Sequence, residues 1–206
     1  MTGTPRQHWD ERYAASELVW SSTPNAFVEQ VAGGLQPGRA LDLGAGEARN
    51  ALWLIEQGWS ATAVDFSKVA LDRARRLADE RLGSDADRLT TVVADLLDYA
   101  AEPVFDLVLV IYIHLPEPER RRVLETAAGS LASGGTLLVI AHHSDNLAHG
   151  VGGPQDPALL YSAEDVLEDL SSAGLDTVRA DRETRVVAGD AGPRDAIDAV
   201  VVLRRP

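Results

Sequence analysis

A short stretch of the chain combines two glycines with a carboxylate in a way that could hold a ligand. Gly44, Ala45 and Gly46 directly follow an apolar run, and Asp42 stands within that run. Glycine lets a ligand approach the backbone closely, whereas a carboxylate would repel an incoming phosphate. A dinucleotide loop also requires G-x-G-x-x-G, and Arg49 occupies the place of the third glycine. The stretch therefore favours a ligand that is cationic and carries no phosphate.

Two more carboxylates belong to the next two predicted strands. Asp65 ends the strand expected over 60–65, and Asp95 follows the strand expected over 89–94. Ligands of open parallel sheets bind at the carboxyl ends of the strands, so we expect these side chains near the glycines. Asp65 could accept two ribose hydroxyls, and Asp95 could accept the amino group of an adenine. Three carboxylates around one crevice suit S-adenosylmethionine, which carries an amine, a ribose, an adenine and a sulfonium.

Histidines fall where an acceptor substrate would arrive. His114 follows the fourth predicted strand, His142 and His143 follow the fifth, and His149 lies in the next loop. We predict His114 and His142 as acid–base groups, with Tyr112 as a rival, and strand alternation allows only one of His142 and His143 to face the crevice. The H-H-x5-H spacing of His142, His143 and His149 could supply metal ligands. We predict no metal site, because the glycine-rich loop fixes no coordination geometry.

The elements that must position these residues follow from hydrophobic periodicity. Short apolar runs alternate with helical patterns, which predicts a mostly parallel sheet with helices on both faces. The last two extended runs are close enough in sequence to pair as a hairpin. We expect strands over 40–43, 60–65, 89–94, 105–113, 136–141, 177–187 and 196–203, and helices over 47–57, 67–82, 116–131 and 162–174. Before them, 1–38 is expected to form a helical cap, with helices over 8–13 and 26–31, on a core over 39–206 within one domain of 1–206.

Composition narrows the function further. The net charge of −13 opposes binding to nucleic acid or to anionic membranes. Cysteine is absent, which excludes disulfides, thiolate metal sites and cysteine nucleophiles. The chain has no apolar run of membrane-spanning length and its N-terminus has no apolar signal core, so we expect a cytoplasmic protein that acts on small molecules. The sequence does not indicate an oligomeric state.

The motifs resemble those of class I S-adenosylmethionine-dependent methyltransferases. The similarity lies in D-L-G-A-G-E-A-R-N over 42–50, V-D-F-S over 64–67 and A-D-L over 94–96. The family has a Rossmann-like, doubly wound α/β sheet of seven strands with one antiparallel strand near the edge, which the predicted hairpin matches. Arg49-Asn50 and the segment from Trp20 to Asn25 are similar to the tellurite-resistance and thiopurine branch. Where many members have a further glycine this chain has Ala48, and we expect only a slight change in how closely the backbone approaches the ligand.

The resemblance also implies which residues would contact the cofactor. The methionine portion would lie against Asp42, Gly44, Ala45 and Gly46. The ribose and adenine would be held by Asp65, Phe66, Asp95 and Leu96. Ile111 and Tyr112 would flank the sulfonium. Three further residues are placed around the cofactor, namely Ser67, Arg49 and Trp20, whose ring could close over the site or anchor the N-terminal helix.

These observations lead to one expected function. The chain is predicted to transfer a methyl group from S-adenosylmethionine to a small-molecule acceptor through a sulfur, selenium or tellurium, or oxygen nucleophile, leaving S-adenosylhomocysteine. A sulfur or selenium nucleophile needs little or no base, whereas an oxygen acceptor can require one. Two alternatives stay open: a regulatory protein that binds the cofactor without turnover, and an NAD-dependent oxidoreductase. A DNA or tRNA methyltransferase is disfavoured by the acidic charge.

Overall fold

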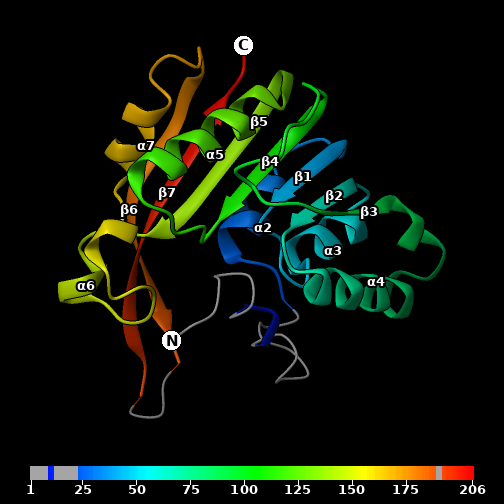
Figure 1. Ribbon diagram of the computed structural model, residues 1–206, viewed down its shortest axis with the longest axis horizontal. Helices are drawn as coiled ribbons and strands as arrows, with labels where there is room; N and C mark the ends of the chain where they lie inside the picture. The colour runs from blue at the N-terminus through cyan, green and yellow to red at the C-terminus, as the bar shows by residue number, and fades with distance from the viewer. Residues whose placement is uncertain (1–8, 12–22, 189–191) are drawn as a thin grey trace.

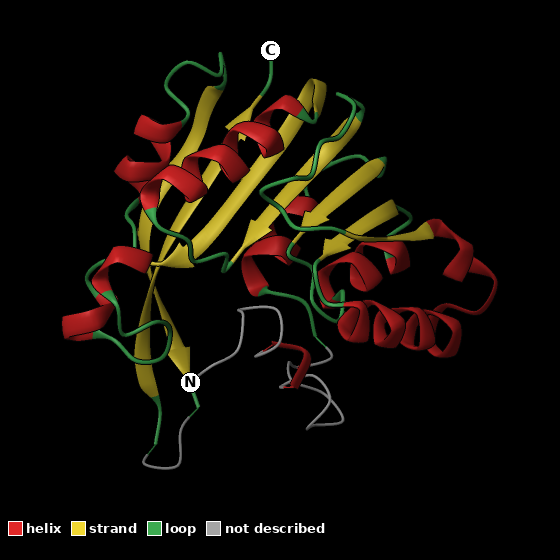
Figure 2. Cartoon of the chain, in the orientation of Figure 1, coloured by secondary structure: helices red, strands yellow, loops and turns green. Residues whose placement is uncertain are grey.

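The computed structural model describes residues 9–11, 23–188 and 192–206. Trp20 and most of the helix predicted over 8–13 lie outside these residues, although 9–11 are helical. Strands and helices alternate along the described chain (Figures 1 and 2). The strands are β1 (Arg39–Leu43), β2 (Ser60–Asp65), β3 (Leu89–Val93), β4 (Phe105–Ile111), β5 (Leu131–His142), β6 (Asp176–Val187) and β7 (Arg194–Arg204). The helices are α2 (Ala26–Ala32), α3 (Arg49–Glu56), α4 (Lys68–Leu82), α5 (Glu117–Gly129), α6 (Asn146–His149) and α7 (Ala163–Asp169), with 3-10 turns over Gly83–Arg88 and Pro157–Leu159.

The described strands form one seven-stranded sheet in the order β3-β2-β1-β4-β5-β7-β6. β7 runs antiparallel to both of its neighbours, and the other pairs are parallel. This confirms the predicted Rossmann-like sheet, including the antiparallel strand near the edge and the pairing of the last two runs. β1 pairs with both β2 and β4, so the strand order reverses beside the glycine loop, at the position where such sheets bind ligands.

Helices cover both faces of the sheet, and each face has its own core. On one face α2, α3 and α4 pack against alternate strand residues such as Ala40, Ala63 and Ile140. On the other face α5 and α7 pack against the intervening residues, such as Leu41 and Val139. Because side chains alternate along a strand, Asp42, Asp65 and His142 share the face of the first group.

Several element boundaries differ from those predicted. The helix expected from residue 47 begins at Arg49, because Ala48 adopts φ 59°, in the left-handed region that a right-handed helix excludes. The strand expected to reach residue 113 ends at Ile111, because Tyr112 has φ 56°. α7 ends at Asp169 rather than near residue 174. β5 begins earlier than expected, and the predicted loop over 142–157 contains α6.

The second predicted helix of the N-terminal cap is present as α2. The side chain of Asn25 accepts a hydrogen bond from the backbone of Phe27 at 2.9 Å and so caps this helix. Val28 and Ala32 are buried in the first core. Within the described residues no helix is both long enough and apolar enough to cross a membrane.

Candidate active site

The glycine loop after β1 is held close to the sheet. The backbone N–H groups of Gly44 and Ala45 both donate to the carbonyl oxygen of Val64, at 2.8 and 3.0 Å. Gly44 has φ 72°, and a side chain added there would collide with Ile113. Glycine is therefore required at this position by backbone conformation and by space.

Ala48 closes the same loop in a backbone conformation that alanine does not favour. Its φ of 59° and ψ of 30° are left-handed, a conformation that costs non-glycine residues about 1–2 kcal/mol. The side chain is fully buried in the first core. The buried methyl group offsets part of this strain, at about 0.8 kcal/mol for one carbon. The glycine that many members of the resembled family have here thus corresponds to a backbone requirement.

Asp42 is a buried carboxylate with one oxygen left unpaired. It is 2% exposed, and its Oδ2 has no hydrogen-bond partner among the described residues. Burial raises its pKa from 3.8 to about 7, although the nearby Arg49 guanidinium acts in the opposite direction. A buried oxygen without a partner is unfavourable unless a ligand completes its hydrogen bonding. The donor that suits it is a cationic N–H group.

Asp65 connects the glycine loop to the start of α4. One carboxylate oxygen accepts the Gly46 N–H and the other accepts the Ser67 N–H, each at 2.8 Å. Burial raises the pKa of Asp65, and these two hydrogen bonds lower it in part. Each carboxylate oxygen has a second lone pair available for a ligand hydroxyl. Ser67 also caps α4 by accepting the Ala70 N–H, as the sequence predicts.

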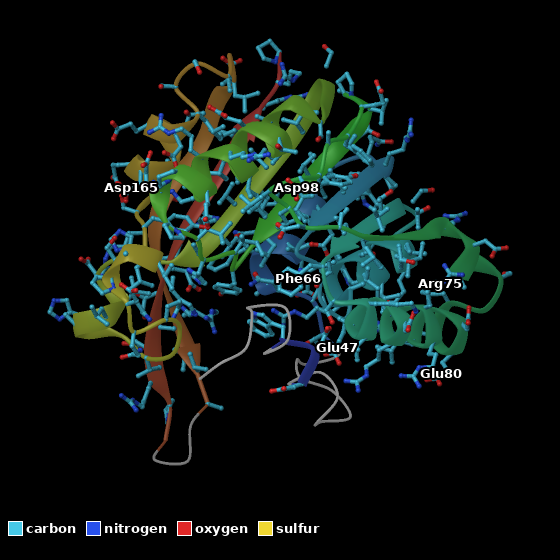
Figure 3. The ribbon with its side chains drawn as sticks, viewed as in Figure 1. Glu47, Phe66, Arg75, Glu80, Asp98 and Asp165 are labelled. Carbon is cyan, nitrogen blue, oxygen red and sulfur yellow. The ribbon has the colours of Figure 1, made fainter. Side chains whose placement is uncertain are left out.

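The residues expected around the adenine flank this loop. Figure 3 shows Phe66 beyond β2 and Glu47 beyond β1, both near the carboxyl ends of the strands. Leu96 is buried beside the loop, with its Cδ1 3.6 Å from the position that a Cβ on Gly44 would take, an ordinary van der Waals distance. Asp95 is exposed, and one of its oxygens accepts the Leu97 N–H at 2.9 Å.

Arg49 and Asn50 have separate roles at the start of α3. The buried Asn50 accepts the Asn25 N–H through its Oδ1 at 2.9 Å, which ties the segment before α2 to the glycine loop. Burial lowers the pKa of Arg49, while the neighbouring Tyr112 and Asp42 raise it. The Arg49 guanidinium thus interacts electrostatically with Asp42 of β1 and with Tyr112, which follows β4.

Three aromatic side chains meet beyond β4 and β5. The ring of His142 lies 4.9 Å from that of Tyr112 and 5.4 Å from that of His114, the last pair being nearly parallel at 11°. Tyr112 donates its hydroxyl hydrogen to Asp198 at 2.9 Å. Gly153 lies over the His142 ring so closely that any side chain at this position would collide with it.

Comparison with known proteins shows similarity to methyltransferases. Residues 40–135 match the family described as "Methyltransferase domain". The tRNA 5-carboxymethoxyuridine methyltransferase of Escherichia coli (strain K12) is 29% identical over 135 residues, which cover 65% of this chain and 49% of that protein. A structure solved for the conversion of a disulfide bond into a thioacetal group during echinomycin biosynthesis superimposes with a TM-score of 0.77 at 21% identity, covering 98% of this chain and 92% of that one. TehB from Haemophilus influenzae gives a TM-score of 0.70 at 17% identity, covering 98% and 67%.

Residues 40–135 match a methyltransferase family, and the whole described sheet has the fold of the solved structures named above. The likeness to TehB agrees, at the level of fold, with the resemblance to the tellurite-resistance branch. S-adenosylmethionine is the cofactor of this family, and the unpaired oxygen of Asp42 fits its cationic ammonium group. The chain spans about half the length of the curated relatives it matches.

The methyltransferase fold brings most of the predicted site residues to one edge of the sheet. Asp42, Asp65 and the glycine loop lie on the cofactor side, and Tyr112, His114 and His142 cluster beyond β4 and β5. Ile111 ends β4 and is buried. Trp20 lies outside the described residues. His143 faces away from this cluster and accepts the Asp145 N–H at 3.0 Å, and His149 is exposed on α6.

Two residues of the methyltransferase site were missed by the sequence analysis. Asp198 is fully buried in β7, and Arg185 of β6 donates to it through Nε at 2.9 Å. The signal available was a single acid inside an apolar strand, A-I-D-A-V-V-V-L over 196–203. Charged residues are rarely buried without a partner, so this acid could have been singled out. Among the described residues, no cluster of three or more His, Asp or Glu side chains could hold a metal ion.

Proposed function

We propose that this chain transfers the methyl group of S-adenosylmethionine to a small-molecule acceptor by direct in-line displacement. The observation that carries the proposal is the unpaired, buried Oδ2 of Asp42 beside the glycine loop. A cationic ammonium group within reach would restore the hydrogen bond that burial removes from this oxygen. Because the same cation stabilises the ionised carboxylate, binding should be accompanied by proton release from Asp42 near neutral pH.

The remaining cofactor contacts follow from where the described residues lie. Asp65 keeps one free lone pair on each oxygen, which suits a pair of ribose hydroxyls. We assign the adenine to Phe66, Leu96 and Asp95, which follow β2 and β3, and the sulfonium to Ile111 and Tyr112 at the end of β4. Arg49 approaches both Asp42 and Tyr112. Its position fits the end of the methionine portion, whose carboxylate would pair with a guanidinium.

The acceptor side supports a small molecule with a sulfur, selenium or tellurium, or oxygen nucleophile. The cofactor supplies a methyl group already activated on a sulfonium, so alignment of the acceptor contributes much of the rate, up to about 7–11 kcal/mol for good positioning. The curated relative named above acts on tRNA, whereas the net charge of −13 here opposes contact with a polyanion. The histidine and tyrosine cluster provides the groups for any proton transfer.

Isothermal titration calorimetry provides the first test. S-adenosylmethionine and S-adenosylhomocysteine should bind, and NAD should not. Asp42→Asn should weaken binding of S-adenosylmethionine, while Asp72→Asn, an exposed aspartate paired with Lys68, serves as the matched control and should not. Binding of NAD without either adenosyl ligand would show that the chain is an oxidoreductase instead.

Turnover is the second test. Labelled S-adenosylmethionine would be incubated with a thiol, a phenol, a selenite and a tellurite, and methylated products separated and counted. Transfer to at least one acceptor supports the proposal. Tight cofactor binding without transfer to any acceptor in the panel favours a regulatory protein that binds the cofactor without turnover.

A further inference from the structure

Asp198 is the centre of a polar cluster on the acceptor side of the sheet. In the antiparallel pairing of β5 and β7, Asp198 lies directly opposite His142, so both side chains project from the same face. Arg185 of β6 pairs with Ala196, two residues from Asp198, and projects from that face as well. This is the face that carries Asp42 and Asp65. The cluster and the cofactor carboxylates therefore lie on the same face of the sheet.

The contacts of Asp198 divide between its two oxygens. Oδ2 accepts the hydroxyl of Tyr112 and the Nε–H of Arg185, both at 2.9 Å. Oδ1 lies 3.3 Å from Nδ1 of His142, within ion-pair distance, and neither atom makes a hydrogen bond with the described residues. Burial alone would raise the pKa of Asp198, but its contacts with His142, Arg185 and Tyr112 outweigh it and lower the pKa. Asp198 is thus an ionised carboxylate that two donors hold in a fixed orientation toward His142.

The other two candidates are engaged elsewhere. Nδ1 of His114 lies 2.9 Å from the Leu159 carbonyl oxygen, which can only accept, so this nitrogen carries the hydrogen. Burial lowers the pKa of His114 to about 4, which makes it a weak base at neutral pH. Burial and the Asp198 charge raise the pKa of Tyr112 to about 12, so its hydroxyl stays protonated and donates. Nε2 of His114 and Nε2 of His142 both lack a hydrogen-bond partner among the described residues, but only His142 has a carboxylate, that of Asp198, beside its other ring nitrogen.

We propose that His142 and Asp198 form an imidazole–carboxylate pair that removes the proton of the acceptor, whose attacking atom is an oxygen or a nitrogen that carries hydrogen. The proposal rests on the proposed methyl transfer; it favours oxygen over sulfur, selenium and tellurium and adds nitrogen as a second acceptor atom. Asp198 acts as a positioning residue: it keeps the hydrogen of His142 on Nδ1 and leaves the lone pair of Nε2 for the acceptor. An already anionic sulfur, selenium or tellurium acceptor would not need such a pair.

Proton removal and methyl transfer together break two bonds and form two. The bond between the acceptor atom and its hydrogen breaks, and the proton passes to Nε2 of His142. The electron pair left on the acceptor atom forms the new bond to the methyl carbon, while the pair of the carbon–sulfur bond returns to sulfur and neutralises the sulfonium. The imidazolium that results is stabilised by the adjacent Asp198 carboxylate. The groups that face it are Tyr112, His114, Arg185 and Asp198, and Glu183, opposite Asp198 on β6, is already paired with Arg179.

The tautomer of His142 gives a test that needs no turnover. Long-range ¹H–¹⁵N NMR spectra of the histidine rings, assigned with His142→Gln, should show neutral His142 with its hydrogen on Nδ1. In Asp198→Asn the two donors Tyr112 and Arg185 require the amide oxygen, so the amide NH₂ group faces His142. Nδ1 must then accept, and the hydrogen should move to Nε2. A hydrogen on Nε2 in the unaltered protein would overturn the proposal.

Kinetics provide the second readout, with phenol and 4-nitrophenol as probe acceptors. At about pH 8 phenol keeps its proton and 4-nitrophenol is largely ionised, so only phenol needs the base. His142→Gln should slow methylation of phenol by about 10²–10⁴-fold and that of 4-nitrophenol by much less. His143→Gln is the matched control, since His143 faces Asp145 rather than this cluster. Equal slowing of both phenols would overturn the base assignment.

The two proposals can fail separately. An enzyme that methylates thiols or chalcogen oxyanions but no oxygen or nitrogen acceptor would keep the proposed function and overturn this inference. Tight cofactor binding without any transfer would defeat the proposed function, and the NMR result would still judge the His142–Asp198 pair. If Asp198→Asn does not fold, Tyr112→Phe provides a second variant, because it removes one of the two donors to Oδ2 of Asp198. The preference of the His142 hydrogen for Nδ1 should then weaken, and such a loss supports the proposed His142–Asp198 pair.

Discussion

Replacing Asp42 by Asn should make the cofactor-free protein more stable, although Asp42 is proposed to bind the cofactor. The carboxyl is buried, and its pKa is raised from 3.8 to about 7. Above about pH 7, folding therefore removes an ionised group from water. In the unfolded chain the group ionises near 3.8. Stability therefore falls as the pH rises from about 4 toward 7 and levels off above it, since the unfolded chain binds fewer protons.

The size of this effect follows from the pKa change. A rise from 3.8 to about 7 corresponds to about 4 kcal/mol of lost stability above pH 7, at 1.36 kcal/mol for each pH unit. At about pH 4 the loss is about 0.5 kcal/mol, because the group is then only half ionised even when unfolded. Asn has nearly the same shape and no charge. Asp42→Asn should therefore gain about 4 kcal/mol at about pH 8 and little at about pH 4.

Urea unfolding followed by circular dichroism at several pH values measures this difference directly. Asp72→Asn, at an exposed position, should show no such pH-dependent gain. With saturating S-adenosylmethionine the order should reverse, because the native protein binds the cation and the variant does not. If the gain from Asp42→Asn is absent, or is the same at both ends of the pH range, the carboxylate is not desolvated in the way described.

Further outcomes follow from other contacts. Asp65→Asn cannot accept both the Gly46 and Ser67 N–H groups, so its affinity for S-adenosylmethionine should fall by about tenfold or more in calorimetry; unchanged affinity would misplace the ribose. Asp169→Ala leaves the buried Arg120 without its 2.6 Å partner and should lower the free energy of unfolding by about 3–5 kcal/mol in urea, and a loss below 1 kcal/mol would contradict the burial of this pair. Burial lowers the pKa of His114 from 6.5 to about 4, so the native protein should lose stability as the pH falls from about 6.5 to about 4. The variant His114→Gln should lose less stability over this range, which urea unfolding at a series of pH values would measure.

The cofactor side of the site could be predicted from the sequence for a topological reason. In parallel strands the carboxyl ends share one edge, so the residues that follow each strand, such as Asp65 and the glycines after β1, gather without knowledge of the pairing. Asp42 stood out because its charge contradicts a phosphate loop. The sequence did not reveal that Asp65 also accepts two backbone N–H groups and so helps to hold the glycine loop.

The acceptor side could be predicted only in part. Asp198 lies near the start of β7, and it reaches the same edge because this strand runs in the opposite direction. A search for residues that follow strands cannot find it. The left-handed backbone of Ala48 and Tyr112 was also invisible, because neither residue type favours that conformation. These turns decide where α3 begins and where β4 ends. Local propensity therefore predicted these two boundaries only to within two residues.

The cofactor side and the acceptor side of the proposed site come largely from different parts of the chain, and β7 belongs to the later part. The residues proposed for the cofactor all precede or lie within 40–135, the segment shared with the family, whereas His142, Arg185 and Asp198 come after it. The adjacent strands β6 and β7 of this later segment join a sheet whose other strands pair in parallel. A chimera that keeps the first 135 residues and takes the remainder from a relative would therefore exchange the acceptor chemistry while retaining the same methyl donor.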